Sequence, residues 1–193
     1  MAFMIERTSI DDVIIVKPTT FRDERGFFRE VYRQDQFKDL GMPDTFVQLN
    51  HSGSGKGVLR GLHFQWEPPM GKLMRVTRGQ AFLVAVDIRK GSTSLGKWIG
   101  LEVSEENGIQ VWAPAGFARG FCALSDNTEI QYLCTGTYNS KCESGIRWDD
   151  PGIGVAWPIG NPILTKKDQS AQTLSEWLGT PESNYFTYTG KRL

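Results

Sequence analysis

The sequence predicts an all-β domain, folded as a jelly roll or a similar barrel, with helices only as accessories. Segments rich in β-branched and aromatic residues recur about every ten residues along most of the chain. The connections between them contain turn signals such as DERG, EPPMG, SEENG and SDN. Turns of this kind suit antiparallel hairpins rather than strand–helix–strand units, and antiparallel strands that hide their edges form jelly rolls and barrels.

The strand pattern occurs in ten segments, and turn-forming residues separate most of them. We expect each segment to form one strand of the barrel, with a turn in the stretch HSGSGKG between the third and the fourth. In chain order the segments are DVIIVK (12–17), FFREVY (27–32), TFVQLN (45–50), GVLRGLHFQ (57–65), LMRVTRG (73–79), AFLVAVDI (81–88), KWIGLEV (97–103), IQVWAP (109–114), FARGFCAL (117–124) and EIQYLCTG (129–136).

Helical pattern appears in two places. It is weak over residues 33–40, which Gly41 ends, and clearer over residues 166–178, which Gly179 ends. The last stretch, from about residue 180 to 193, is expected to be a loosely held tail. The 193 residues contain no internal repeat and no linker, so we expect a single domain over residues 1–193.

Composition excludes several classes of partner. With 22 basic and 22 acidic residues, the chain has no excess charge to attract nucleic acid or an anionic membrane. The first residues are charged where a signal peptide would be apolar, and the longest apolar run is too short to span a bilayer, so a cytoplasmic protein is expected. Three cysteines (Cys122, Cys134 and Cys142) without CxxC spacing argue against a disulfide framework and a zinc site.

Polar residues inside the predicted strands are the first sign of a binding site. Gln48 and Asn50 share one face of their strand, opposite Val47 and Leu49, and that face meets either solvent or a lined cavity. For one such pair alone, solvent is the better interpretation. Six more polar residues lie within nineteen positions of mostly apolar sequence, and a barrel lined with such cations suggests an anionic ligand. These residues are Arg60, His63, Gln65, Lys72, Arg75 and Arg78.

His63 is the residue whose purpose the sequence leaves most open. It lies three positions after Arg60, so the two would face opposite ways on a regular strand, unless a bulge at Gly61 resets the alternation. A single histidine in an apolar strand is more often a core residue than a catalyst. A metal site is disfavoured, because Gln65 stands where a His-x-His pair would have its second ligand and His51 is the only other histidine. Metal-free chemistry is therefore expected.

Four stretches together resemble the dTDP-4-dehydrorhamnose 3,5-epimerase family of metal-free cupins. They are FRDERGFFRE, QLNHSGSGKGVLRGLHFQ, GKLMRVTRGQAFLVAVDIRKGSTSLGKW and ESGIRWDDPGIGVAWP, and the resemblance covers roughly residues 5–170. It implies a cupin-type jelly-roll barrel with a short C-terminal helix and an enzyme without cofactor. The implied reaction inverts carbons 3 and 5 of dTDP-4-dehydro-6-deoxy-D-glucose to give dTDP-4-dehydro-L-rhamnose, on the way to L-rhamnose. Protons beside the 4-keto group are removable because the charge left behind spreads onto the ketone oxygen.

The resemblance also implies roles for individual residues. His63 matches the general base, Asp168 the carboxylate that orients its imidazole, and Tyr132 the acid on the far face of the sugar ring. Lys72 and Arg60 match the positions that hold the keto oxygen and nearby groups. From the residues alone, Asp168 reads equally well as a helix N-cap, Tyr132 as a barrel-lining aromatic, and the two cations as surface residues.

The nucleotide site follows from the same resemblance. Tyr138 would stack on thymine, and Phe27 with its neighbours would reach across a dimer interface into the partner's site, which implies a homodimer. The matching nucleotide positions are Arg25, Phe27, Glu30, Gln48, Asn50, Tyr138, Glu143 and Lys167.

Arg119 departs from the family pattern, which commonly reads GFAHGF where this chain reads GFARGF. A permanently charged, longer side chain in place of a ligand-contacting histidine would strengthen diphosphate binding or shift the sugar relative to His63. This departure leaves the substrate open, so an epimerase of carbon 3 alone or of another nucleotide-linked keto sugar is the first alternative. Two further alternatives are a non-catalytic nucleotide-sugar-binding jelly roll and a metal-dependent cupin.

Overall fold

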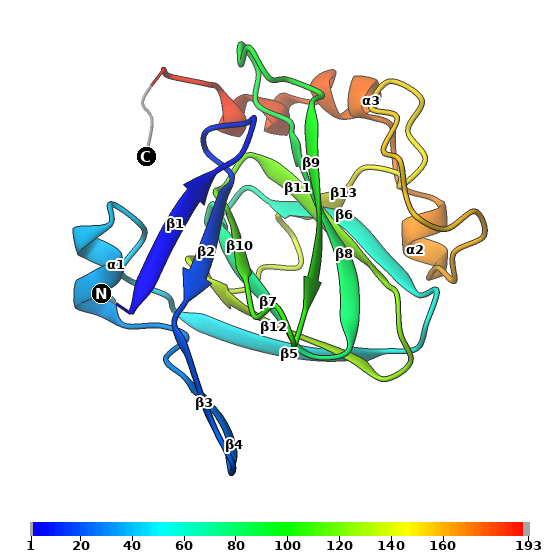
Figure 1. Ribbon diagram of the computed structural model, residues 1–193. Helices are drawn as coiled ribbons and strands as arrows, with labels where there is room; N and C mark the ends of the chain where they lie inside the picture. Colours follow the sequence, from blue (N-terminus) through cyan, green and yellow to red (C-terminus); the bar gives the residue numbers. More distant parts are fainter. Residues whose placement is uncertain (1, 191–193) are drawn as a thin grey trace.

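Two antiparallel sheets that face each other form the barrel in the computed structural model, which describes residues 2–190 (Figure 1). This confirms the all-β jelly-roll prediction. The first sheet has the order β1 (Phe3–Arg7), β2 (Ile14–Pro18), β10 (Gln110–Ala113), β7 (Lys72–Arg78), β12 (Thr128–Cys134) and β5 (Gln48–Ser54). The second has the order β13 (Glu143–Gly145), β6 (Leu59–Gln65), β11 (Phe117–Ala123), β8 (Gln80–Asp87) and β9 (Trp98–Ser104).

A separate hairpin, β3 (Thr20–Asp23) with β4 (Gly26–Arg29), projects away from the barrel at the bottom of Figure 1. Each of the ten predicted segments overlaps a strand, whereas β1, β3 and β13 were not predicted. The turn expected in HSGSGKG is shorter than predicted, because β5 continues through Ser54 in a ladder with β12. The short helix α1 (Gln34–Asp39) falls within the first predicted helical segment.

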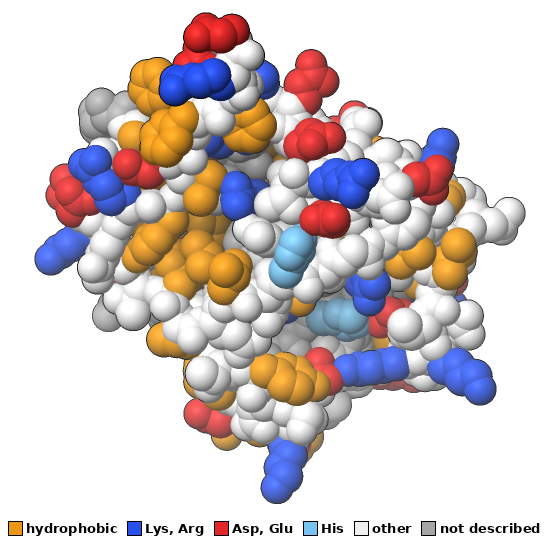
Figure 2. All heavy atoms as spheres, turned by 90° about the horizontal axis from the view of Figure 1, so that it is seen from below, with side chains coloured by type: hydrophobic (Ala, Val, Ile, Leu, Met, Phe, Trp, Pro, Cys, Tyr) orange, Lys and Arg blue, Asp and Glu red, His pale blue; other side chains and the backbone are white. Residues whose placement is uncertain are grey.

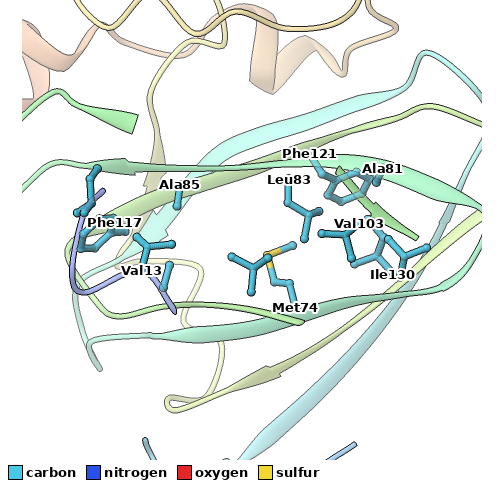
Figure 3. Packing of buried hydrophobic residues seen from close by; sticks show 13 residues of the cluster. Val13, Met74, Ala81, Leu83, Ala85, Val103, Phe117, Phe121 and Ile130 are labelled. Carbon is cyan, nitrogen blue, oxygen red and sulfur yellow. The ribbon is translucent and has the colours of Figure 1, made fainter. Parts of the chain in front are cut away.

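The space between the sheets is filled by apolar side chains from both of them (Figure 3). Met74 and Ile130 come from the first sheet, while Leu83 and Phe121 come from the second, and all four are buried. Each fully buried side chain of this kind contributes about 1.5–3 kcal/mol of burial free energy. This cluster holds the two sheets together and thereby fixes the distance between the walls of the barrel.

The single C-terminal helix predicted over residues 166–178 is wrong, because the structure has two short helices there. The first is α2 (Lys166–Gln169) and the second is α3 (Leu174–Leu178). Thr173 caps the second helix through a capping box with Glu176, and Gln172 pairs with Ile146 in an isolated β-bridge. The cap and the bridge interrupt the helical pattern between the two segments.

The prediction of a loose tail from about residue 180 is also wrong for the part of the tail that the structure describes. Pro181–Phe186 form a 3₁₀ helix, and Phe186 is only 4% exposed. Its ring packs against Phe64 and Trp177, with centroids 6.0 and 6.2 Å away. Residues 191–193 of the predicted tail lie outside the described residues.

The bulge proposed at Gly61 is confirmed by the register of β6 and β11. Arg119 pairs with His63 and Phe121 pairs with Arg60, so two residues of β6 oppose one residue of β11. Because Arg119 and Phe121 are two apart and share a face, Arg60 and His63 share a face as well. Gly61 has φ of +127°, and a Cβ there would lie 2.6 Å from the Cα of Gly120.

We expect Gly61→Ala to lower the free energy of unfolding by about 1–3 kcal/mol, because alanine is strained at this φ and its methyl group would collide with the neighbouring strand. Gly53→Ala on β5 is the matched control, since it has an ordinary φ and nothing within 4 Å of the added methyl group. Urea denaturation of both variants measures the difference. Equal stability of the two would show that the bulge tolerates a side chain.

Candidate active site

His63 and Asp168 form a hydrogen-bonded pair at one end of the barrel. Nε2 of His63, on β6, lies 2.6 Å from Oδ1 of Asp168, on α2. The second carboxylate oxygen accepts a hydrogen bond from the hydroxyl of Thr165 at 2.9 Å. The Asp168 side chain is 3% exposed, whereas the His63 side chain is 33% exposed. The pair therefore has a buried carboxylate held by two hydrogen bonds and a partly exposed imidazole that contacts this carboxylate through Nε2.

The charge of Asp168 is maintained by its partners. Burial alone would raise its pKa, but the hydrogen bonds from His63 and Thr165 outweigh this effect and hold the pKa below the usual carboxyl value. Thr165, and not Asp168, is the N-cap of α2, because its hydroxyl accepts a hydrogen bond from the Asp168 backbone N–H. The helix-cap interpretation of Asp168 is therefore wrong, and its side chain is directed at the histidine.

Lys72 and Tyr132 lie on the other sheet and line the same cavity as His63. The Lys72 ammonium lies 4.9 Å from the centre of the Tyr132 ring. Gln48 and Asn50 also line this cavity. The polar face of β5 therefore meets a cavity and not solvent, while the apolar Leu49 on its other face is 58% exposed.

The two sheets thus form opposite walls of a hollow of about 140 Å³. His63, Phe64 and Gln65 come from β6, and residues of β5, β7 and β12 face them. The complete lining is Gln48, Asn50, His63, Phe64, Gln65, Met70, Lys72, Tyr132, Tyr138 and Glu143.

Burial changes the acidity of both Lys72 and Tyr132. Burial, together with the nearby positive charge of Arg119, lowers the pKa of Lys72 to about 8. Burial raises the pKa of Tyr132 above its ordinary value. At neutral pH the phenol of Tyr132 is therefore a protonated donor. The pKa of the Lys72 ammonium lies only about one unit above neutral pH.

The rim of the cavity is a chain of side-chain hydrogen bonds. The Gln48 amide donates to Asn50 at 2.9 Å and accepts from the Tyr138 backbone N–H at 2.8 Å. The Tyr138 hydroxyl donates to Glu143 at 3.1 Å, and Lys167 forms an ion pair with the same carboxylate. These contacts bring together residues that the resemblance placed around the nucleotide.

An outer groove of about 330 Å³ continues from this rim. It is lined by Lys167, Ser170 and Gln172 among others, and it shares His63 and Glu143 with the inner cavity. The site therefore has a narrow inner chamber and a wider outer one, with the histidine at their junction.

Five of the residues expected at the site are absent from the lining of both hollows in the described chain. Arg25, Phe27 and Glu30 belong to the projecting hairpin and the segment after it, and they line neither hollow. Arg60 donates to Ser54 and to the Gly53 carbonyl at the end of β5, and Arg119 lies in the barrel interior.

Thr165 is one of the residues of the site that the sequence analysis missed. Its position three residues before Asp168 and directly before a helical segment is the local signal of an N-cap that could have shown it. Within residues 2–190, no three His, Cys, Asp or Glu side chains are grouped so that they could hold a metal ion. No helix in the same range is long and apolar enough to cross a membrane.

A model of the dTDP-4-dehydrorhamnose 3,5-epimerase family matches residues 7–176. The chain belongs to this family. The dTDP-4-dehydrorhamnose 3,5-epimerase of Escherichia coli (strain K12) is 50% identical over 173 residues, which cover 88% of this chain and 94% of that protein. The family predicted from the sequence motifs is therefore confirmed.

Two further relatives bear on the substrate. A crystal structure of the dTDP-6-deoxy-D-glucose-3,5-epimerase of Legionella pneumophila in complex with dTDP-4-keto-L-rhamnose has 43% identity and a TM-score of 0.90, and covers 94% of this chain and 96% of that one. A dTDP-4-dehydrorhamnose 3-epimerase from Streptomyces niveus is 38% identical over 169 residues, 86% of this chain and 82% of that protein. The family thus includes enzymes named for two inversions and for one.

The low pKa of Lys72 predicts how stability changes with pH. Between about 8 in the folded protein and the ordinary 10.5, the unfolded chain binds more protons, so the free energy of unfolding should rise with pH in this range. Lys72→Met should remove this rise of the free energy of unfolding with pH, and it should stabilise the fold at pH 7 by about 1–3 kcal/mol.

Urea denaturation at several pH values measures the free energy of unfolding of both proteins. Lys141→Met, which replaces an exposed lysine, is the control. Identical slopes in Lys72→Met and wild type would refute it.

Proposed function

We propose that this protein epimerises carbons 3 and 5 of dTDP-4-dehydro-6-deoxy-D-glucose to give dTDP-4-dehydro-L-rhamnose. The observation that carries the proposal is the placement of the His63–Asp168 pair on one wall of the cavity and of Tyr132 and Lys72 on the other. Inversion at a carbon needs a base on one face of the ring and an acid on the opposite face. The two walls provide this arrangement.

His63 removes the proton from the carbon beside the ketone. Its Nδ1 accepts the proton, and the Asp168 carboxylate at 2.6 Å from Nε2 stabilises the imidazolium that forms. The electron pair of the broken C–H bond moves to the ketone oxygen and gives an enolate. Lys72 lies on the wall opposite the base, where its ammonium stabilises this oxygen.

Tyr132 returns a proton on the other face of the ring. The phenol O–H breaks, the proton bonds to the same carbon with inverted configuration, and the electron pair returns from the enolate oxygen to restore the ketone. The raised pKa of Tyr132 keeps the donor protonated until the strongly basic enolate is present. The imidazolium and the phenolate then exchange a proton through solvent to restore the starting state.

The outer groove suits the nucleotide. Its lining includes Lys167, a cation for the diphosphate, and Tyr138 at the rim is 58% exposed and available to stack on a base. Gln48 and Asn50 offer amide groups at the entrance. We place the enzyme in the cytoplasm, which the free thiols of Cys122, Cys134 and Cys142 support because reducing compartments keep thiols free.

A homodimer completes the site in this proposal. Phe21, Phe27 and Phe28 on the hairpin are each at least 60% exposed, and Leu49 on β5 and Val47 just before it are also exposed. Figure 2 shows hydrophobic side chains gathered on the face from which the hairpin projects. Burying such a surface against a second copy stabilises a dimer. The hairpin residues Arg25, Phe27 and Glu30 would then reach the nucleotide in the partner's site.

Inversion at carbon 3 alone is the second candidate, favoured by the 38% identity to a relative named as a 3-epimerase. Both reactions use the same base and acid, and they differ in how the ring is placed after the first inversion. Incubation with dTDP-4-dehydro-6-deoxy-D-glucose in deuterated water separates them by mass spectrometry and proton NMR. Label at carbons 3 and 5 supports the main proposal, label at carbon 3 alone supports the second, and dTDP binding without label indicates a non-catalytic binding protein.

His63→Ala and Tyr132→Phe should fail in different ways. Loss of the base should abolish deuterium exchange at both carbons, whereas loss of the phenol should leave proton removal while slowing inversion by about 100-fold or more. The affinity for dTDP should stay within about twofold in both, because both variants keep Tyr138, Glu143 and Lys167, the groups proposed to bind the nucleotide. Substantial exchange in His63→Ala would place the base elsewhere, and normal inversion in Tyr132→Phe would make the tyrosine a lining residue.

Complementation tests whether the hairpin serves the partner's site. We expect His63→Ala and the double variant Arg25→Ala/Phe27→Ala to be inactive alone but to regain about a quarter of the wild-type sites when co-expressed, since each hybrid dimer has one site with a good base and a good hairpin. His63→Ala co-expressed with Asp168→Asn is the control, and it should regain nothing. No recovery in the first mixture would mean that each hairpin serves its own chain.

A further inference from the structure

Arg119 is a buried guanidinium with few partners. Its side chain is 4% exposed, and Nη1 donates to the backbone carbonyl of Ala113 at 3.2 Å. Nε and Nη2 are buried without a hydrogen-bond partner, and Arg119 forms no ion pair with any residue of the described range 2–190. A buried, unpaired charge is costly, and a protein that keeps one at its active site gains something other than stability from it.

The register of the strands places this guanidinium behind Lys72. Arg119 starts on β11, directly opposite His63 in the ladder with β6. It reaches across the barrel to Ala113, which is the ladder partner of Lys72. Arg119 and Lys72 line one small interior void together with Met74 and other core residues, while Lys72 alone of the two also lines the active-site cavity.

The size of this void decides between two roles for Arg119. It has a volume of about 10 Å³, which is no more than a single water needs, and apolar side chains form the rest of its wall. A diphosphate, which is large and strongly hydrated, does not fit there. The direct contact with the diphosphate considered from the sequence therefore does not match the place of Arg119 in the fold.

We propose that Arg119 is a positioning residue that acts through Lys72: from behind the ammonium it sets the charge state in which Lys72 works and adds a fixed positive charge to the wall facing the ketone oxygen. A guanidinium keeps its charge at any physiological pH, so its field does not depend on proton transfer during the reaction. At the low effective dielectric of a barrel interior, two cations that line the same small void influence each other strongly.

Several other titratable groups lie near Lys72. Tyr132 and Cys134 come from β12, Glu143 from β13 and His63 from β6. Burial is the largest cause of the low pKa of Lys72 and Arg119 the next, whereas Cys134 and Glu143 oppose them. Of these groups, Arg119 is the one cation that lines the small interior void together with Lys72.

That the two cations stabilise an enolate rests on the proposed function, but the effect of Arg119 on the charge state of Lys72 does not. The pKa of Lys72 can be measured without substrate, by NMR titration of protein that contains ¹³Cε-labelled lysine. The Lys72 signal is identified as the one that is missing in Lys72→Met. In Arg119→Gln the pKa of Lys72 should rise by about half a unit or more, and in Arg119→Lys it should change by less than half as much. Arg75→Gln, which removes a half-buried arginine from the same strand outside that void, should leave it unchanged.

Kinetics give the second measurement. For Arg119→Gln we expect kcat at pH 7 to fall about tenfold to a hundredfold, the alkaline limb of kcat/KM to move to higher pH, and dTDP affinity to stay within about twofold. The variant should fold, with a melting temperature at or above that of wild type, because an unpaired buried charge is removed.

Each other outcome has a defined meaning. An unchanged Lys72 titration and alkaline limb would overturn the proposal and leave Arg119 as a filler of the barrel interior. A tenfold or greater loss of dTDP affinity with a normal titration would overturn it in favour of a phosphate contact. A wild-type protein that shows no exchange with the keto sugar would contradict the proposed function alone, since the titration still tests the link between Arg119 and Lys72.

Discussion

A proton that leaves one face of a sugar ring and returns to the other requires two groups on facing walls. The sandwich of two sheets meets this requirement, since His63 belongs to one sheet while Lys72 and Tyr132 belong to the other. One sheet alone would not, because neighbours on its surface lie about 5 Å apart and point the same way. The remaining parts of the site attach to this frame: Asp168 holds the imidazole from outside the barrel, and the rim residues extend the cavity toward solvent.

The barrel interior is divided between stability and chemistry. Met74, Leu83 and Phe121 fill one part of it with apolar contacts, and the charged groups of Lys72 and Arg119 border the same space. The apolar cluster offsets the cost of burying those charges. Active sites commonly hold groups that would be replaced if stability were the only constraint, and the arrangement here follows that rule.

Sequence reasoning was most effective where local pattern decides structure. Strand sequences either alternate between apolar and polar residues or are apolar over a few consecutive residues. A histidine or lysine in or beside such a stretch is therefore visible as an exception, as His63 and Lys72 were. Gln48 and Asn50 stayed ambiguous because the apolar neighbour Leu49 is exposed, so polarity does not reveal which side of β5 faces inward. That direction depends on the position of the second sheet, and hence on contacts distant in the sequence.

The remaining errors have the same cause. The loose tail was wrong because Phe186 packs on Phe64 and Trp177, contacts that no local pattern shows. The single C-terminal helix was wrong because Gln172 is taken by a bridge to Ile146. The place of Arg119 behind Lys72 depends on the register of three strands, and a motif comparison shows only that the residue differs.

The hydrogen bond between His63 and Asp168 joins residues that are 105 positions apart. During synthesis, the strand that carries the imidazole leaves the ribosome long before the carboxylate is made, and the intervening strands must be threaded into both sheets before the two can meet. Partly synthesised or truncated chains consequently hold the histidine without the group that orients it. In the proposed mechanism, a chain that ends before Asp168 therefore has the base without the carboxylate that orients it.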